Sequence, residues 1–150
     1  MKTIARNKKA THDYFILETY EAGIVLTGTE IKSIRAGRVN LKDSYVRTTR
    51  TNEAYIINLH IAKFKEGNRF NHDETRERKL LLNKMEILKM RQKSKQEAAT
   101  IIPLQLYLTR GKAKLEIALA KGKKKYDKRR DLKEKAMKRE VDKAMKDRNR

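Results

Sequence analysis

The fold class is decided by the segment IIPLQLYLTRGKAKLEIALA, residues 101–120. Residues 101–109 and 112–120 predict two strands, because β-forming residues lie on both sides of a turn at Arg110-Gly111. In the second strand Leu115, Ile117 and Leu119 alternate with polar or small residues, which is the period of a half-buried strand. The segment therefore predicts a β-hairpin.

The stretch before this hairpin predicts a capped helix. Asn83 and Glu86 have a spacing close to that of a capping box, so we expect a helix that begins at Lys84 and runs into the 90s. Residues 76–82 then form a short turn, and the polar residues 64–74 form a loop. Pro103 lacks an N–H, so it belongs near the start of its strand or at a sheet edge.

The first half of the chain predicts further strands. Residues 13–27 are typical of strand–turn–strand with a break at Gly23, and residues 44–50 and 54–61 of a hairpin around Thr51-Asn52-Glu53. A short helix between them begins with a cap at Thr29 and ends at Gly37. We expect residues 1–10 to be a flexible arm and Phe15 to lie in the core.

Together these elements indicate a mainly β fold with flanking α, an OB-like antiparallel β-barrel with short helices over residues 1–122. Such barrels bind oligonucleotides on a strand face and loops. The pattern by itself also allows another small β-barrel or an α+β sandwich.

Residues 123–150 form a basic C-terminal tail of different character. Residues 121–150 hold 15 Lys or Arg against 6 Asp or Glu, and too few apolar residues to offset the entropy of ordering. Asp131–Lys135, Glu134–Lys138 and Asp142–Lys146 have the i,i+4 spacing that supports a helix. We expect a tail that is disordered alone and becomes helical with a partner.

The net charge indicates the class of partner. The 150 residues carry a formal net charge of +20, which repels itself unless a polyanion supplies counter-charge. Nucleic acid is the first candidate and an anionic membrane surface the second. No cysteine is present, the N-terminus lacks an apolar signal region, and no apolar run approaches the ~20 residues that span a bilayer. We expect a soluble cytoplasmic protein.

Basic and aromatic residues mark candidate RNA contacts. Structured RNA is recognised through phosphate contacts, shape and stacking on unpaired bases, and Tyr14, Tyr45 and Tyr126 lie close to basic or polar positions. The basic patches are Arg6, Lys8 and Lys9, then Arg76, Arg78 and Lys79, and then the run from Lys121 to Arg130.

Motifs for catalysis are few. His12-Asp13 and His72-Asp73 offer metal-ligating atoms, but adjacent strand residues point to opposite faces. The sequence has neither a phosphate-cradling G-x-x-x-x-G-K-[ST] loop nor a G-x-S-x-G motif. We therefore expect no enzyme activity, no metal and no cofactor.

Several ordered blocks resemble the small protein B (SmpB) family, the bacterial partners of transfer-messenger RNA (tmRNA, or SsrA RNA). The blocks are Ala10–Ile16, Glu21–Ile24, Gly28–Ser33, Asn40–Tyr45, Asn71–Asp73, Arg76–Leu82, Pro103–Tyr107 and Gly122–Arg129. They run from about Ile4 into the tail. The resemblance implies an OB-like barrel that binds the tRNA-like domain of transfer-messenger RNA and enters stalled ribosomes for trans-translation as a monomer, without catalysis.

The resemblance also implies which residues act. The positions that contact RNA in the family correspond to His12, Glu21, Leu81 and Asn83. His12 would stack on a base, Asn83 would also cap a helix, and Leu81 would pack beneath the contact surface. The tail would occupy the empty decoding site and message path through Lys123, Lys124, Lys125, Tyr126, Asp127, Lys128 and Arg129. Some family members have His where this chain has Tyr126, so aromatic stacking is the shared capability there.

Three other functions remain as alternatives. A structural ribosomal protein has the same charge and a similar tail, but would accompany every ribosome. A metal-dependent nuclease would use His12, Asp13, His72 and Asp73 and lose activity on chelation. A membrane-surface protein would need a wider apolar stripe than the tail offers.

Overall fold

The computed structural model describes residues 1–64 and 71–123. The strands are β1 (Lys2–Arg6), β2 (Tyr14–Ile24), β3 (Val39–Asn40), β4 (Tyr45–Thr48), β5 (Ala54–Ile57), β6 (His60–Ile61), β7 (Arg78–Leu81), β8 (Thr100–Thr109) and β9 (Lys112–Gly122). The helices are α1 (Ala10–Asp13), α2 (Gly28–Arg35) and α3 (Lys84–Glu97).

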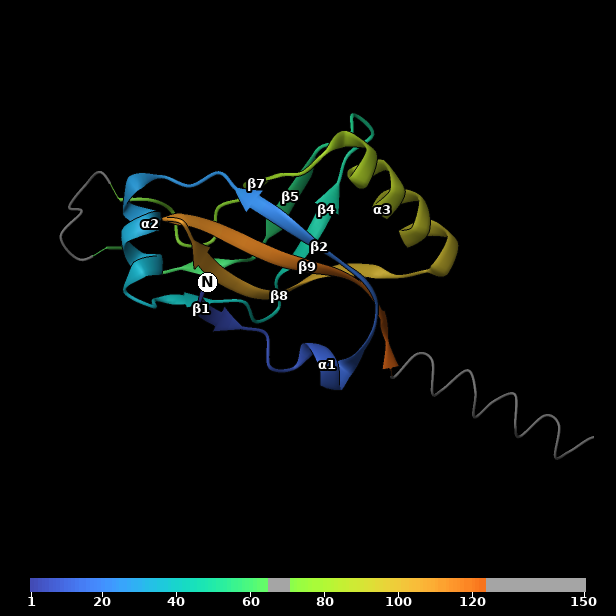
Figure 1. Ribbon diagram of the computed structural model, residues 1–150, viewed down its shortest axis with the longest axis horizontal. Coiled ribbons are helices and arrows are strands. Elements are labelled where there is room, and N and C mark those ends of the chain that lie inside the picture. The colour runs from blue at the N-terminus through green and yellow to red at the C-terminus, as the bar shows by residue number, and fades with distance from the viewer. Residues whose placement is uncertain (65–70, 124–150) are drawn as a thin grey trace, which may run out of the picture.

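Seven of the strands form one antiparallel sheet in the order β1-β8-β9-β2-β7-β5-β4. Strand β4 packs against β8, so the sheet closes on itself as a barrel around one hydrophobic core. In Figure 1, α2 lies at one end of the barrel, α3 runs along the other, and α1 lies below β2 and β9. The expected mainly β, OB-like architecture is confirmed.

The β8–β9 hairpin is confirmed with the turn at Arg110 and Gly111, both in the left-handed region with φ of 50° and 76°. Strand β9 also pairs with β2 along almost its whole length, which makes it a central strand. Leu115, Ile117 and Leu119 are buried as their alternation predicts. Pro103 lies near the start of β8, beside a register shift between Pro103 and Gln105.

Residues 14–24 form one strand, so the predicted turn at Gly23 is wrong. Backbone pairing with β9 continues through Gly23, and this long-range ladder overrides the local tendency of glycine to break a strand. A bulge between Ile16 and Glu18 reverses the face of the sheet on which the preceding side chains lie. Tyr14 and Ile16 therefore contact a second small core beneath α1.

Two more segments form strands that the sequence did not predict. Residues 2–6 are not a flexible arm, because β1 pairs with β8. Residues 78–81 are not a turn, because β7 pairs with β2 and β5. Both strands are short and basic, and pairing with a distant strand stabilises them more than local propensity does.

Both longer helices begin as N-cap chemistry requires. The cap of α2 is Thr27, not Thr29: its side chain accepts from the Glu30 backbone while the Glu30 carboxylate accepts from the Thr27 N–H at 2.8 Å. The predicted cap of α3 is confirmed, because Asn83 Oδ1 accepts from the Met85 N–H at 3.0 Å.

The hairpin around residues 51–53 is confirmed as β4 and β5. Its second strand is shorter than predicted, because Asn58 takes a left-handed φ of 61° and the chain resumes as β6 beside β3. Of the predicted loop, residues 65–70 lie outside the described residues, and 71–74 belong to no helix or strand. In the described ranges no helix is long and apolar enough to cross a membrane.

A buried ionic cluster lies where α2 meets β7. Glu30 and Arg78 are both 0% exposed. The Arg78 Nε donates to Glu30, its Nη1 donates to the Leu59 carbonyl at 2.6 Å, and its Nη2 donates to the Asp73 carbonyl at 3.3 Å. Arg76 donates to the other Glu30 oxygen at 2.5 Å. The cluster thus joins α2, β7 and two connecting segments.

Burial alone would raise the pKa of Glu30, but the hydrogen bonds from Arg76, the Thr27 backbone and Arg78 outweigh it and hold that pKa below its ordinary value of 4.5. The unfolded chain therefore binds this proton at a higher pH than the folded chain. The stability that Glu30 contributes is present above about pH 4.5 and is lost as the pH falls through the lower folded value.

Replacement Glu30→Gln should lower the free energy of unfolding by about 3–5 kcal/mol, because it leaves Arg78 charged and buried without its counterion. Urea unfolding followed by circular dichroism at pH 7 measures the change. The variant should also lose part of the wild-type decline in stability below pH 4.5. The exposed pair of Glu97 and Lys121 supplies the control, since Glu97→Gln should change stability little. Equal effects of the two substitutions would contradict the role of the buried cluster.

Candidate nucleic-acid interface

Strand register places two candidate residues on one outer face of the barrel. Glu21 of β2 lies opposite Glu116 of β9, and Gly23 lies opposite Leu81 of β7. Opposed residues of an antiparallel pair share a face, and so do residues two apart on a strand. Glu21 and Leu81 therefore lie on the same side of the sheet, and Ala22 is buried on the core side.

The absence of a side chain at Gly23 lets Leu81 lie close over β2. A Cβ at Gly23 would be 3.2 Å from the Leu81 Cβ, tighter than ordinary contact. Leu81 is nevertheless 55% exposed. The expectation that Leu81 packs beneath the surface is therefore wrong: it presents an apolar side chain at the surface, where an unpaired base or a ribose can pack on it.

A buried tyrosine orients the Glu21 carboxylate. The Tyr107 hydroxyl, on β8, donates to Glu21 Oε2. Burial, and then this hydrogen bond, raise the pKa of Tyr107 to about 12. Tyr107 is protonated at neutral pH and donates to Oε2, and the other Glu21 oxygen can accept from a base amino group or a ribose hydroxyl.

Asn83 completes a shallow hollow with Glu21 and Leu81. The hollow has a volume of about 420 Å³, and Lys79 and Lys84 also line it. The capping bond uses the Asn83 carbonyl oxygen, and no described residue accepts from its NH₂ group. Three of the four positions inferred from the family resemblance thus lie together, with donor, acceptor, apolar and cationic groups in one place.

His12 lies apart from this hollow. It belongs to α1, which precedes β2, whereas Glu21 lies toward the other end of that strand (Figure 1). The side chain is 88% exposed, and its Nδ1 lies 2.9 Å from the Asp13 carboxylate, which orients the ring. An exposed, oriented imidazole can stack on a base. The candidate contacts therefore extend along β2 and do not converge on one point.

The basic candidates differ in their surroundings. Arg6 ends β1, and Lys8 and Lys9 lie between β1 and α1. All three are exposed, and none of them forms an ion pair with a described residue. Lys79 is half-exposed and lies 3.5 Å from Glu53. Arg76 keeps partial exposure while it pairs with Glu30.

Arg78 is not an RNA contact in this fold. It is fully buried in the ionic cluster, so the prediction from charge alone is wrong for this residue. His72 is also structural: it is buried, with Nδ1 2.9 Å from the Thr29 hydroxyl and Nε2 2.8 Å from the Ile61 carbonyl. Within residues 1–64 and 71–123, no group of three or more His, Asp or Glu side chains could hold a metal ion.

The start of the tail lies beside α1. Lys123 Nζ donates to the Thr11 carbonyl at 2.9 Å and lies 5.2 Å from the centre of the Phe15 ring. Phe15 is 39% exposed, so its predicted place in the core is wrong: it lies opposite Lys121, beyond Leu119, which is the last β9 residue of the main core. The remaining tail candidates, residues 124–129, lie outside the described residues.

The sequence did not indicate Tyr107 as part of the site. It lies 86 residues from Glu21 along the chain, and the two meet only because β8, β9 and β2 are neighbours in the sheet. Gly23 could have been recognised from the sequence as part of this site, because a glycine within a strand indicates close approach of another backbone or side chain.

Comparison with known proteins identifies the family. The model of the SmpB protein family matches residues 4–147. An SsrA-binding protein of Oceanobacillus iheyensis is 62% identical over 146 residues, which are 97% of this chain and 94% of that protein. An SsrA-binding protein of Bacillus cereus is 59% identical over 147 residues, 98% of this chain and 94% of the relative.

Solved structures include a similar chain from work described as "tmRNA-SmpB: a journey to the center of the bacterial ribosome". It superposes with a TM-score of 0.67 at 48% identity, and the match covers 79% of this chain and 83% of that one. With a family model that matches nearly the whole chain and relatives at about 60% identity, this chain belongs to the SmpB protein family.

Proposed function

We propose that this chain binds the tRNA-like domain of transfer-messenger RNA and delivers it to stalled ribosomes for trans-translation. The observation that carries the proposal is the 62% identity, over 97% of the chain, to a protein named for binding SsrA RNA. A net charge of +20 supports a polyanionic partner. In this function the chain holds RNA as a cytoplasmic monomer and catalyses no step.

The outer face supplies the chemistry for specific RNA contacts. Glu21 accepts from a base amino group or a ribose hydroxyl, and Asn83 donates through its NH₂ group, which has no acceptor among the described residues. Leu81 provides an apolar surface between them, and His12 stacks on an unpaired base. Around these residues, Lys8, Lys9 and Lys79 neutralise phosphates without reading sequence.

The tail serves the ribosome in this proposal. Residues 1–122 form the RNA-binding barrel and residues 123–150 the tail. Lys128 and Arg129 contact ribosomal RNA phosphates, Asp127 orients them, and Tyr126 stacks on a base. Because Lys123 is held against Thr11 and Phe15, the tail starts next to His12 and α1.

Full-length protein should retain labelled tRNA-like domain of transfer-messenger RNA against an excess of ordinary tRNA. Competition binding at near-physiological salt measures this selectivity. The affinity should fall steeply as salt rises, because bound Lys and Arg residues release counterions from RNA. If ordinary tRNA displaces the label as readily as unlabelled target does, the chain is a general basic protein of the ribosome and the proposal fails.

Replacement Asn83→Ser should separate the two roles of Asn83. Serine caps a helix about as well as asparagine, so thermal stability should change little. Loss of the amide donor should weaken affinity for the tRNA-like domain about fivefold, the value of one hydrogen bond of about 1 kcal/mol. Asn83→Ala serves as comparison, since it should lose both the cap and the affinity. Unchanged affinity in Asn83→Ser would remove Asn83 from the interface.

Replacement of Asp127, Lys128 and Arg129 together by alanine should leave RNA affinity nearly unchanged but stop peptide tagging on stalled ribosomes. A chain truncated after Arg130 should behave in the same way. RNA affinity in the competition titration and tagging in a reconstituted translation reaction give the two readouts. A large loss of RNA affinity in either variant would show that the barrel and tail are not divided as proposed.

A further inference from the structure

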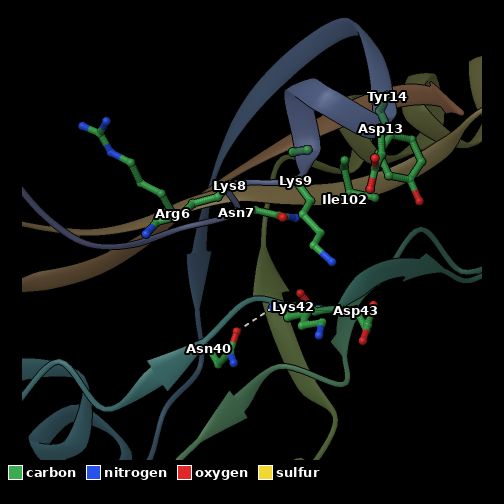
Figure 2. Close-up of a pocket in the computed structure, with 12 residues that line it drawn as sticks. Arg6, Asn7, Lys8, Lys9, Asp13, Tyr14, Asn40, Lys42, Asp43 and Ile102 are labelled. Carbon is green, nitrogen blue, oxygen red and sulfur yellow. Dashed lines mark hydrogen bonds between the residues drawn. The ribbon is translucent and has the colours of Figure 1, made fainter. Parts of the chain in front are cut away.

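A cavity of about 360 Å³ lies between two segments that are distant in sequence. One wall is the segment from Arg6 to Tyr14, which includes α1, and the other is the connection from Asn40 to Ser44 between β3 and β4 (Figure 2). The cavity is separate from the hollow at Glu21, Leu81 and Asn83. Its volume is in the usual range for small-molecule sites.

Hydrogen bonds hold the β3–β4 wall rigid. Asn40 Oδ1 accepts from the Lys42 N–H at 2.9 Å, and the Ser44 hydroxyl donates to the Leu41 carbonyl at 2.6 Å. The Leu41 side chain is buried and anchors the turn in the core. Asp43 has a left-handed φ of 60°, a conformation that Asp adopts more readily than most non-glycine residues and that suits the turn.

The opposite wall is anchored independently. Asn7 donates through its side chain to the Pro103 carbonyl at 2.9 Å and through its backbone to the Leu104 carbonyl at 2.8 Å. Ala10 packs in the small core with Ile102 and Ala120. Since each wall is held by its own contacts, the space between them is preformed.

The cavity has an unbalanced charge. Arg6, Lys8, Lys9 and Lys42 line it, and none of these four cations forms an ion pair with a described residue. Figure 2 shows Lys9 extending from the α1 side toward the segment that holds Lys42 on the other wall. Cations that line one space repel each other, and an anion bound there reduces that repulsion and gains charge-assisted hydrogen bonds.

A simple anion does not account for the rest of the lining. The carboxylates of Asp13 and Asp43 also line the cavity, together with the half-buried ring of Tyr14. Carboxylates repel a bare phosphate but accept hydrogen bonds from the amino groups of a nucleobase, and an aromatic ring offers a stacking surface. The lining therefore suits a ligand with a phosphate at one end and a flat hydrogen-bond donor at the other.

We propose that this cavity binds one nucleotide, with its phosphate between Lys9 and Lys42 and its base at Tyr14 and Asp43. The nucleotide is a residue turned out of the bound RNA or a free nucleotide, which present the same phosphate and base. In the first case the inference rests on the proposed function: the cavity is a second contact with the RNA, on another part of the barrel from Glu21, Leu81 and Asn83.

The test is an NMR titration of the isotope-labelled full chain with 5′-GMP, 5′-AMP and 5′-UMP, and separately with inorganic phosphate. The nucleotides should shift the amide signals of residues 7–14 and 40–44 in a saturable way, and more tightly than phosphate does. The Lys9→Ala, Lys42→Ala double variant should weaken nucleotide binding at least tenfold. Lys95→Ala removes an exposed lysine on α3, away from the cavity, and should leave nucleotide binding unchanged.

Two outcomes overturn the inference. Phosphate that produces the same shifts with the same affinity as the nucleotides would show an anion site without a base subsite. Shifts confined to other parts of the chain, or none, would show that the cavity binds no nucleotide. Stability of each variant is followed by thermal unfolding, so that a folding defect is not mistaken for lost binding.

Competition binding with the tRNA-like domain distinguishes the sources of the nucleotide and separates this inference from the proposed function. If RNA abolishes the nucleotide shifts and Lys42→Ala, which changes none of the phosphate contacts proposed above, loses more RNA affinity than Lys95→Ala, the ligand is a residue of the RNA. If RNA and free nucleotide bind together, the ligand is the free nucleotide.

Selective RNA binding without any nucleotide shift leaves the proposed function standing and refutes nucleotide binding in the cavity. Nucleotide shifts without selective RNA binding would refute the proposed function and leave the cavity inference standing.

Discussion

Glu30 and Arg78 lie side by side, fully buried, where α2 meets the barrel. An uncompensated charge at this depth is strongly destabilising, so each side chain requires the other. The pair fixes α2 against β7, and the remaining Arg78 donors fix the backbone at Leu59, Asp73 and Glu74. Because Arg78 points inward, the alternation of a strand turns Lys79 and Leu81 outward. The buried pair thereby determines which β7 side chains reach the hollow.

Strand β2 pairs with β7, which carries Arg78, and strand β9 lies on the other side of β2. Strand β9 pairs with β8 on one side and β2 on the other, which brings Tyr107 next to Glu21. The hollow then lies toward one end of β2, and α1 with His12 and Lys123 lies at the other. Strand β2 thus separates the hollow at Glu21, Leu81 and Asn83 from His12 and the start of the tail.

The net charge indicates a polyanionic partner, but it does not identify which Lys and Arg side chains contact that partner. Arg78 is a core residue, and Arg76 shares its carboxylate partner. Arg6, Lys8, Lys9 and Lys42 form no ion pair with any described residue, so their charges remain available to phosphates. Net charge is a property of composition, whereas availability depends on whether folding supplies a carboxylate nearby.

Reasoning from residues close together in the chain predicted the β8–β9 hairpin with Arg110-Gly111, the hairpin around residues 51–53 and the Asn83 cap of α3. The same pattern allowed more than one mainly β architecture. The ordered motif blocks also determined the family. Contacts between distant parts of the chain make β1 and β7 strands, continue β2 through Gly23, bury Arg78, leave Phe15 exposed and bring Tyr107 to Glu21. Turns and caps are built from residues within a few positions of each other, whereas strand register and burial are set by partners tens of residues away, which local propensity does not encode.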